Sequence, residues 1–111
     1  MGLLKKFEIY VLRLLMPTVL SAEQIDAVIS EGEFVSYDYS GSGYFLTIKH
    51  PSLPTDRTVC SKPTVMGQAG EIVCGFILFM ENHELTLECH SWETASVPEG
   101  FREGQVDITV V

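Results

Sequence analysis

Two apolar segments and the polar turn between them decide the fold: EIVCGFILFM at 71–80, ENHE at 81–84 and LTLECH at 85–90. Residues 71–80 are apolar on both sides of an extended chain, and such strands lie mid-sheet with another layer on each face. Residues 84–90 instead alternate, with Leu85, Leu87 and Cys89 between polar neighbours, which is typical of a half-buried strand. The polar segment between them predicts an antiparallel hairpin.

Upstream, the apolar period changes from two to that of a helix. Residues 3–16 predict an amphipathic helix that packs on the core and ends at Pro17, although the alternation of Phe7, Ile9 and Val11 also permits a strand. Its charged residues fall mostly off the apolar stripe; they are Lys5, Lys6, Glu8 and Arg13. Ser21 and Gln24 form a capping-box pattern, which predicts a second helix over 22–31 that ends at Gly32.

The remaining segments predict more strands. Residues 34–39 and 44–48 flank SGSG (40–43) as a hairpin. Residues 57–61 suggest a short edge strand, 62–70 a loop or an irregular strand, 97–104 a loop and 105–111 a final strand. We therefore expect one α+β domain over 1–111, with two N-terminal helices packed on one face of a mostly antiparallel sheet of five to six strands.

The charge of the chain is strongly negative and uneven. Its 111 residues, the length of one domain, include 15 acidic and seven basic residues, for a net charge of −8. Residues 1–20 carry a net charge of +2, whereas residues 21–111 carry −10. This charge disfavours nucleic acid and anionic membranes as partners and attracts cations or basic proteins. Solubility alone is the simpler explanation of the same charge.

The cysteines and the N-terminus bear on the cellular compartment. There are three cysteines, an odd number without a C-x-x-C pair, which suits a reducing compartment. Lys5 and Lys6 precede an apolar run, as in a signal peptide, but Glu8 and Arg13 interrupt that run. The same charges exclude a membrane span of ~20 apolar residues. We expect a soluble, cytoplasmic protein.

The residues that could carry catalysis or bind a metal lack the required spacing. Cys89 and His90 are adjacent on a strand, so their side chains point to opposite faces and cannot form a thiolate–imidazole pair. His50, His83 and the cysteines show none of the local spacings of a zinc site. Phosphate-binding and nucleophile-elbow motifs are also absent from the sequence. We expect no enzyme activity, no cofactor and no metal.

One side of the strand at 84–90 is the candidate binding surface. Glu84, Glu88 and His90 share this side, Glu88 at ~14 Å from Glu84 and ~7 Å from His90. Trp92, the only tryptophan, joins them if the alternation continues, with Glu81 and Glu93 at the rim. A solvated face with a core-edge tryptophan is the simpler interpretation. The alternative is a protein-binding surface, in which tryptophan is over-represented.

The C-terminal part of the chain carries a family resemblance. The run from Gly75 to Trp92, followed by Val97-Pro98, Phe101-Arg102 and Val106, resembles small bacterial proteins that we associate with the immunity proteins of toxin–immunity systems. The resemblance implies a cytoplasmic protein without catalysis that binds and blocks a cognate toxin domain. Many such toxins are nucleases with basic clefts, onto which an acidic inhibitor is steered electrostatically.

The leading hypothesis is thus an acidic binding protein, an immunity protein that neutralises a basic toxin domain as a monomer or weak homodimer. Two alternatives remain. One is a small-molecule or peptide-binding module with a pocket between helices and sheet. The other is a structural subunit of a homo-oligomer that pairs through residues 105–111.

Overall fold

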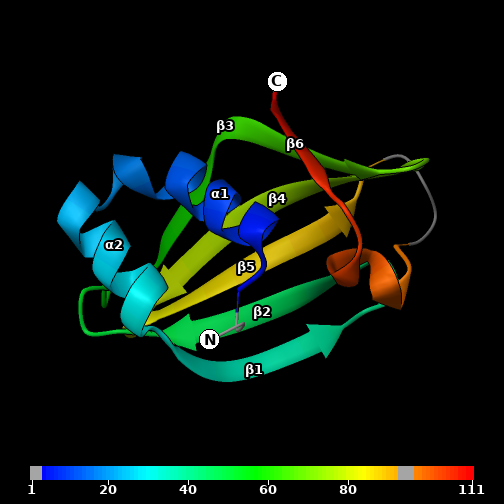
Figure 1. Cartoon of the computed structure of the whole chain (residues 1–111). Helices are drawn as coiled ribbons and strands as arrows, with labels where there is room; N and C mark the ends of the chain where they lie inside the picture. Colours follow the sequence, from blue (N-terminus) through cyan, green and yellow to red (C-terminus); the bar gives the residue numbers. More distant parts are fainter. Residues whose placement is uncertain (1–3, 93–96) are drawn as a thin grey trace.

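The computed structural model describes residues 4–92 and 97–111. Two helices come first in the chain and pack on one face of an antiparallel sheet (Figure 1). The elements, in chain order, are α1 (Lys6–Leu15), η1 (Met16–Thr18), α2 (Ala22–Glu31), β1 (Glu33–Tyr39), β2 (Gly43–Lys49), β3 (Thr58–Ala69), β4 (Ile72–Glu81), β5 (Glu84–Ser91), η2 (Glu99–Glu103) and β6 (Asp107–Val110). The predicted α+β class, with both helices on one face of the sheet, is confirmed.

The six strands of the described residues form one sheet in the order β1-β2-β5-β4-β3-β6, and every neighbouring pair is antiparallel. A two-residue turn sets the register of the central hairpin. Asn82 and His83 both have positive φ, 54° and 63°, as the tightest hairpin turns require. Glu81 therefore pairs with Glu84, and the alternation along β5 follows from that pairing.

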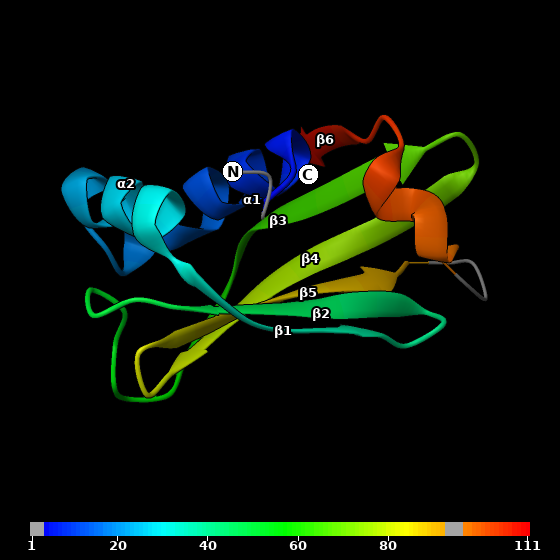
Figure 2. The same cartoon turned by 60° about the horizontal axis from the view of Figure 1, so that its bottom comes forward.

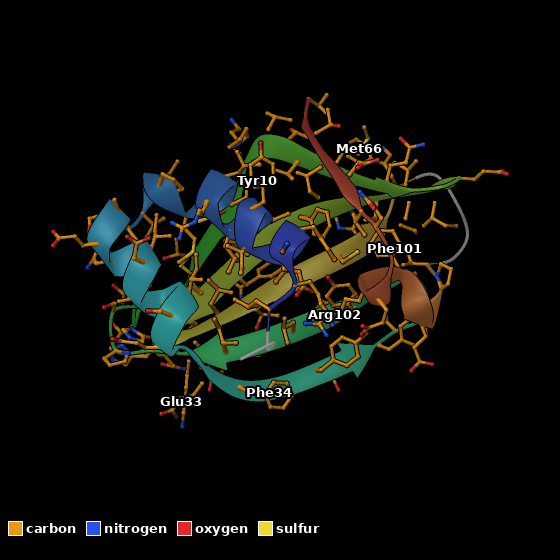
Figure 3. All side chains as sticks on the ribbon, viewed as in Figure 1. Tyr10, Glu33, Phe34, Met66, Phe101 and Arg102 are labelled. Atoms are coloured by element: carbon orange, nitrogen blue, oxygen red, sulfur yellow. The ribbon has the colours of Figure 1, made fainter. Side chains whose placement is uncertain are left out.

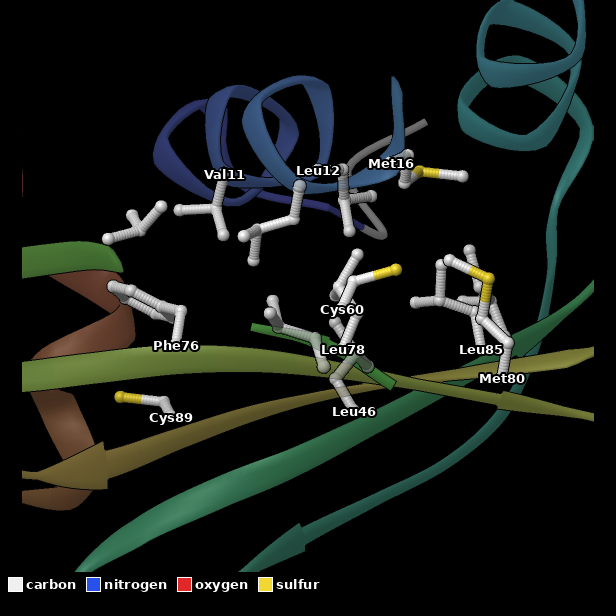
Figure 4. Close-up of a cluster of buried hydrophobic side chains, with 14 of the residues drawn as sticks. Val11, Leu12, Met16, Leu46, Cys60, Phe76, Leu78, Met80, Leu85 and Cys89 are labelled. Carbon is white, nitrogen blue, oxygen red and sulfur yellow. The ribbon is translucent and has the colours of Figure 1, made fainter. Parts of the chain in front are cut away.

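The core lies between the helices and the sheet. Val11, Leu12 and Leu15 of α1 are fully buried, and Figure 4 shows the first two above Leu46 and Leu78 of the sheet. The capping box that begins α2 is present, since the Ser21 hydroxyl accepts a hydrogen bond from the Gln24 amide. No helix in the described part of the chain is long and apolar enough to cross a membrane.

The opposite surface of the sheet has no helix over it in the described residues (Figure 2). We call this surface the open face; it bears, among others, Phe45, Ile77, Phe79, Glu88 and His90. The expectation that β4 has a layer on each side is therefore wrong. Its second apolar side, which includes Ile77 and Phe79, is only half-buried by neighbouring strands.

Three segment predictions are resolved by the structure. Residues 62–70 form the irregular strand and not the loop, because β3 runs from Thr58 to Ala69 with a register shift between Cys60 and Val65. The predicted edge strand at 57–61 is confirmed for Thr58 to Cys60, which pair with β4 alone, but it is the start of a longer strand in which Val65 to Gln68 also pair with β6. The predicted loop at 97–104 contains η2, a short 3₁₀ helix.

Candidate functional site

The centre of the open face is apolar. Phe45 on β2 and Val59 on β3 are 36% and 49% exposed, while Ile77 and Phe79 on β4 are half-buried between them. The four strands β2, β5, β4 and β3 are about 4.8 Å apart and share about seven residues of length, so this surface covers roughly 500 Å². Only part of that area is apolar, because Thr47 of β2 and Glu84, Thr86 and Glu88 of β5 also lie on it. Exposed apolar side chains gathered on one face of a monomer commonly mark interaction sites.

The sequence-predicted binding residues lie on this face. Glu84 is opposite Lys49, Glu88 is flanked by Phe45 and Ile77, and His90 is flanked by Gly43 and Gly75. The Trp92 amide donates a hydrogen bond of 3.0 Å to the Val73 carbonyl, so the strand pairing continues to the tryptophan. Glu81 pairs with Glu84 on the same side, whereas Glu93 lies outside the described residues. The shared face is as predicted, but it is less polar than the sequence of β5 suggests.

A hollow of about 260 Å³ opens in the open face beside His90 and Trp92. Gly75 forms part of its floor, and a Cβ at this position would lie 2.8 Å from the His90 ring nitrogen Nε2 and 3.4 Å from the indole of Trp92. Because Gly75 has no side chain, the rings of His90 and Trp92 can pack against the backbone of β4. Across the hollow, Ser61 and Thr64 belong to the segment of β3 that departs from the pairing with β4.

His90 has an unusual environment. Its Nδ1 atom is buried and has no hydrogen-bond partner in the part of the chain that the structure describes. Buried polar atoms are paired in the great majority of cases, so this unpaired nitrogen is an exception within the described residues. Cys89 faces the opposite side and is buried in the core, which confirms that the two cannot form a catalytic pair. Its contact with Cys74, together with burial, raises the pKa of the Cys89 thiol, which disfavours the thiolate form.

The charges on the open face are mostly negative. Five acidic side chains from β1, β4 and β5 lie on it: Glu33, Asp38, Glu81, Glu84 and Glu88. Lys49 forms an ion pair with one of them, since its ammonium lies 3.7 Å from the Glu33 carboxylate. Both groups are exposed, so the pair contributes little to stability. Arg57, with Phe79 and Glu81, lines a second depression of about 180 Å³ at the same end. The open face thus combines an apolar centre with a net negative charge.

The other two histidines are held by local hydrogen bonds. His50 Nδ1 accepts from the Ser52 amide at 3.0 Å, so the proton is on Nε2, which donates to Glu31 at 2.8 Å. His83 Nδ1 donates to the Leu53 carbonyl at 2.9 Å. No three His, Cys, Asp or Glu side chains of the described residues gather into a possible metal site.

A buried ion pair is the feature that the sequence analysis missed. Glu8, assigned there to the polar side of its helix, is fully buried. The Arg102 Nε and Nη2 atoms donate to its two carboxylate oxygens at 2.6 and 2.9 Å, and the Tyr44 hydroxyl donates at 2.5 Å. Figure 3 shows Arg102 projecting from η2, and its guanidinium stacks on the Tyr37 and Tyr44 rings. The only sequence signal is that Glu8 shares a helix face with Leu12 and Leu15.

This cluster is closed and structural. Burial and the adjacent Glu8 carboxylate raise the pKa of Tyr44 above the ordinary value for tyrosine. A phenol that remains protonated and donates to a sealed carboxylate is not placed to react with a substrate. The cluster instead ties the C-terminal segment to α1 and β2, over 94 residues of chain.

No protein-family model, characterised protein or solved structure matches this chain in comparisons of its sequence and fold. The features of this chain that bear on function are those of the open face: its apolar centre, its acidic side chains and the hollow beside Trp92.

Proposed function

We propose that this protein is a non-catalytic binding protein that docks a basic protein domain on its open face. In line with the resemblance of residues 75–106, we propose that the partner is a bacterial toxin domain that the chain neutralises in the cytoplasm as an immunity protein. The binding residues in this proposal are Glu84, Glu88, His90 and Trp92, with Glu81 at the rim.

One observation carries the proposal: a strand that is apolar on both sides has only one side covered. Ile77 and Phe79 alternate with the core residues Leu78 and Met80, yet in the described residues nothing packs over them. Leaving such side chains in water forgoes about 25 cal/mol for every Å² that a partner would cover. With its rim, a surface of roughly 500 Å² approaches the ~800 Å² that each partner contributes to a standard interface.

Charge decides which partner fits. A second copy of this chain would bring the acidic side chains of two open faces together, including Glu84 and Glu88 of each. Like charges opposed across an interface cost several kcal/mol, whereas a basic surface there is complementary. A basic partner also complements the net charge of −8 of the chain.

The test uses the open reading frame next to this gene. Its C-terminal domain is expressed and its binding to the full chain is measured by biolayer interferometry at two salt concentrations. Reversal of charge in the double variant Glu84→Lys/Glu88→Lys is expected to weaken binding about 10- to 100-fold, mainly through a slower on-rate, and to flatten the salt dependence. Glu23→Lys/Asp26→Lys is the matched control, since both residues are exposed acids on α2, away from the open face, and the net charge changes by the same amount.

Three outcomes oppose the proposal. Equal loss of binding in Glu23→Lys/Asp26→Lys and in the open-face variant would mean that overall charge, not this surface, attracts the partner. Binding that the double variant leaves unchanged in affinity and salt dependence would remove the open face from consideration. A chain that forms dimers by light scattering, and loses them on Phe79→Ser, would assign the same surface to self-association.

A further inference from the structure

The hollow beside Trp92 has the size of a binding pocket for a single side chain. Its volume of about 260 Å³ lies below the ~300–1,000 Å³ of pockets that take drug-sized ligands or cofactors. It forms because two features coincide: Gly75 contributes no side chain to the open face, and residues 61–64 of β3 depart from the pairing with β4. Because it opens on the proposed docking surface, a side chain of the partner can enter it.

The walls of the hollow combine aromatic rings with hydrogen-bond acceptors. Trp92, which is 39% exposed, lies at one wall, and His90 lies beside it. Ser61 and Thr64 of β3 line the rest, and within the described residues no hydrogen bond engages their hydroxyls. Such a set suits a group that stacks on a ring and donates several hydrogen bonds at once.

A carboxylate lies next to the hollow. Glu88 is paired with Ile77, a residue of the hollow's wall, and is two residues from His90 on the same side of β5. That spacing places Glu88 about 7 Å along the strand from His90. Within residues 4–92 and 97–111, no hydrogen bond or ion pair engages its carboxylate, although it is half-buried. A half-buried carboxylate without a cation favours a cationic occupant.

We propose that this hollow receives the guanidinium group of an arginine side chain that the basic partner presents, stacked on Trp92 and paired with Glu88. This inference rests on the proposed function. Arginine fits better than lysine because its planar group stacks on an indole and offers five donors in a fixed geometry. An apolar side chain would cover the Ser61 and Thr64 hydroxyls without pairing them, and an anion would be repelled by the net charge of −8.

The experiment uses the full chain and the tripeptide acetyl-Gly-Arg-Gly-amide at constant ionic strength. Trp92 is the only tryptophan, so its fluorescence reports on the hollow without a label. A saturable change is expected, with half-saturation at about 1–10 mM, the range that a ligand of this size reaches. The peptide with citrulline, which keeps the shape of arginine without its charge, is expected to bind at least tenfold more weakly. Equal binding of both peptides, or no fluorescence change with either, would overturn the proposal.

Two matched carboxylate variants locate the pairing. Glu88→Gln is expected to weaken the arginine peptide about fivefold to tenfold. Glu84→Gln removes the same charge from the same side of β5, but ~14 Å farther from the hollow, and is expected to change binding less than twofold. Ser61→Phe fills the hollow from an exposed position, so it keeps the fold and should abolish binding. Equal effects of the two glutamine variants would refute a specific pairing with Glu88.

Lysine at position 62 supplies a test in the opposite direction. Lys62 lies between Ser61 and Thr64 in the irregular segment of β3, so its charge opposes an incoming arginine. Lys62→Gln is expected to tighten the arginine peptide about twofold, and a weakening would contradict the proposal. If the peptide fails while Glu84→Lys/Glu88→Lys still weakens the partner domain, only the arginine pocket is wrong. If the peptide binds as expected but no partner domain does, the proposed function is wrong and the pocket stands.

Discussion

Removing the guanidinium of Arg102 should destabilise the protein more than any single change on its surface. In Arg102→Leu, the Glu8 carboxylate keeps only the Tyr44 hydroxyl and the Lys5 amide as donors, at 2.5 and 2.8 Å. It has no access to water in the folded state, since Glu8 is fully buried. The variant therefore leaves a buried charge without its counter-ion.

The size of the effect follows from the geometry. Breaking a buried ion pair by removing one partner costs about 3–5 kcal/mol, a large share of the ~5–15 kcal/mol that stabilises a typical domain. For a domain of this length the midpoint of thermal unfolding should fall by roughly 12–20 °C. Glu8→Met should cost less than Arg102→Leu, because the arginine side chain retains 15% exposure and stacks on Tyr37.

The double variant Glu8→Met/Arg102→Leu separates the pair from its surroundings. With both charges gone, no uncompensated ion remains. The free energy of unfolding of the double variant should therefore lie within about 2 kcal/mol of the wild-type value and above that of Arg102→Leu alone. The residual loss reflects the Tyr44 hydroxyl and the Lys5 amide, which lose their acceptor. Urea unfolding followed by circular dichroism gives all four free energies of the cycle. A cost below about 1 kcal/mol for Arg102→Leu, or additive single effects, would refute this account.

Three further predictions concern the same fold. Because the pKa of Tyr44 is raised in the folded state, above pH ~10 the unfolded chain loses a proton that the folded chain keeps. The free energy of unfolding should therefore fall by up to ~1.4 kcal/mol for each pH unit. Urea unfolding at about pH 9–11 should show a shallower decline in the variant Tyr44→Phe. Gly43→Ala, whose Cβ would lie 1.7 Å from a backbone oxygen, should abolish folding or cost over ~4 kcal/mol, whereas Gly41→Ala, at φ +87° in open space, should cost only ~1 kcal/mol by thermal unfolding. In the sheet, Leu78→Ala should cost about 2–5 kcal/mol and Phe45→Thr under ~1 kcal/mol, because only the first side chain is in the core; equal costs in urea would show that the open face is covered.

Much of the fold follows from local patterns. The capping box at Ser21, the alternation in β5 and the apolar run of β4 each depend on residues a few positions apart, and each predicts its element correctly. The same alternation predicts that Glu84, Glu88 and His90 share one side of the sheet. For residues 62–70 the sequence could not distinguish a loop from an irregular strand, because the side chains of an interrupted strand do not alternate regularly between its two faces.

The sequence predicts the candidate site less well than the fold, because the polarity and shape of that surface depend on residues from neighbouring strands. β5 by itself presents a polar side, yet Phe45 and Ile77, which flank Glu88 from β2 and β4, make the centre of that surface apolar. The hollow beside Trp92 likewise needs Gly75 from one strand and the displaced Ser61 from another.

The sequence by itself determines most of the secondary structure, the negative charge of the chain and the set of side chains that project from the regular strands, because these follow from spacing along the chain. Only the tertiary structure decides which side of β4 the helices cover and which stays open. It also decides that Glu8 is a buried partner of Arg102, 94 residues away, and not a solvated charge. Both outcomes depend on contacts between distant segments, and no local period in the sequence records which segments meet.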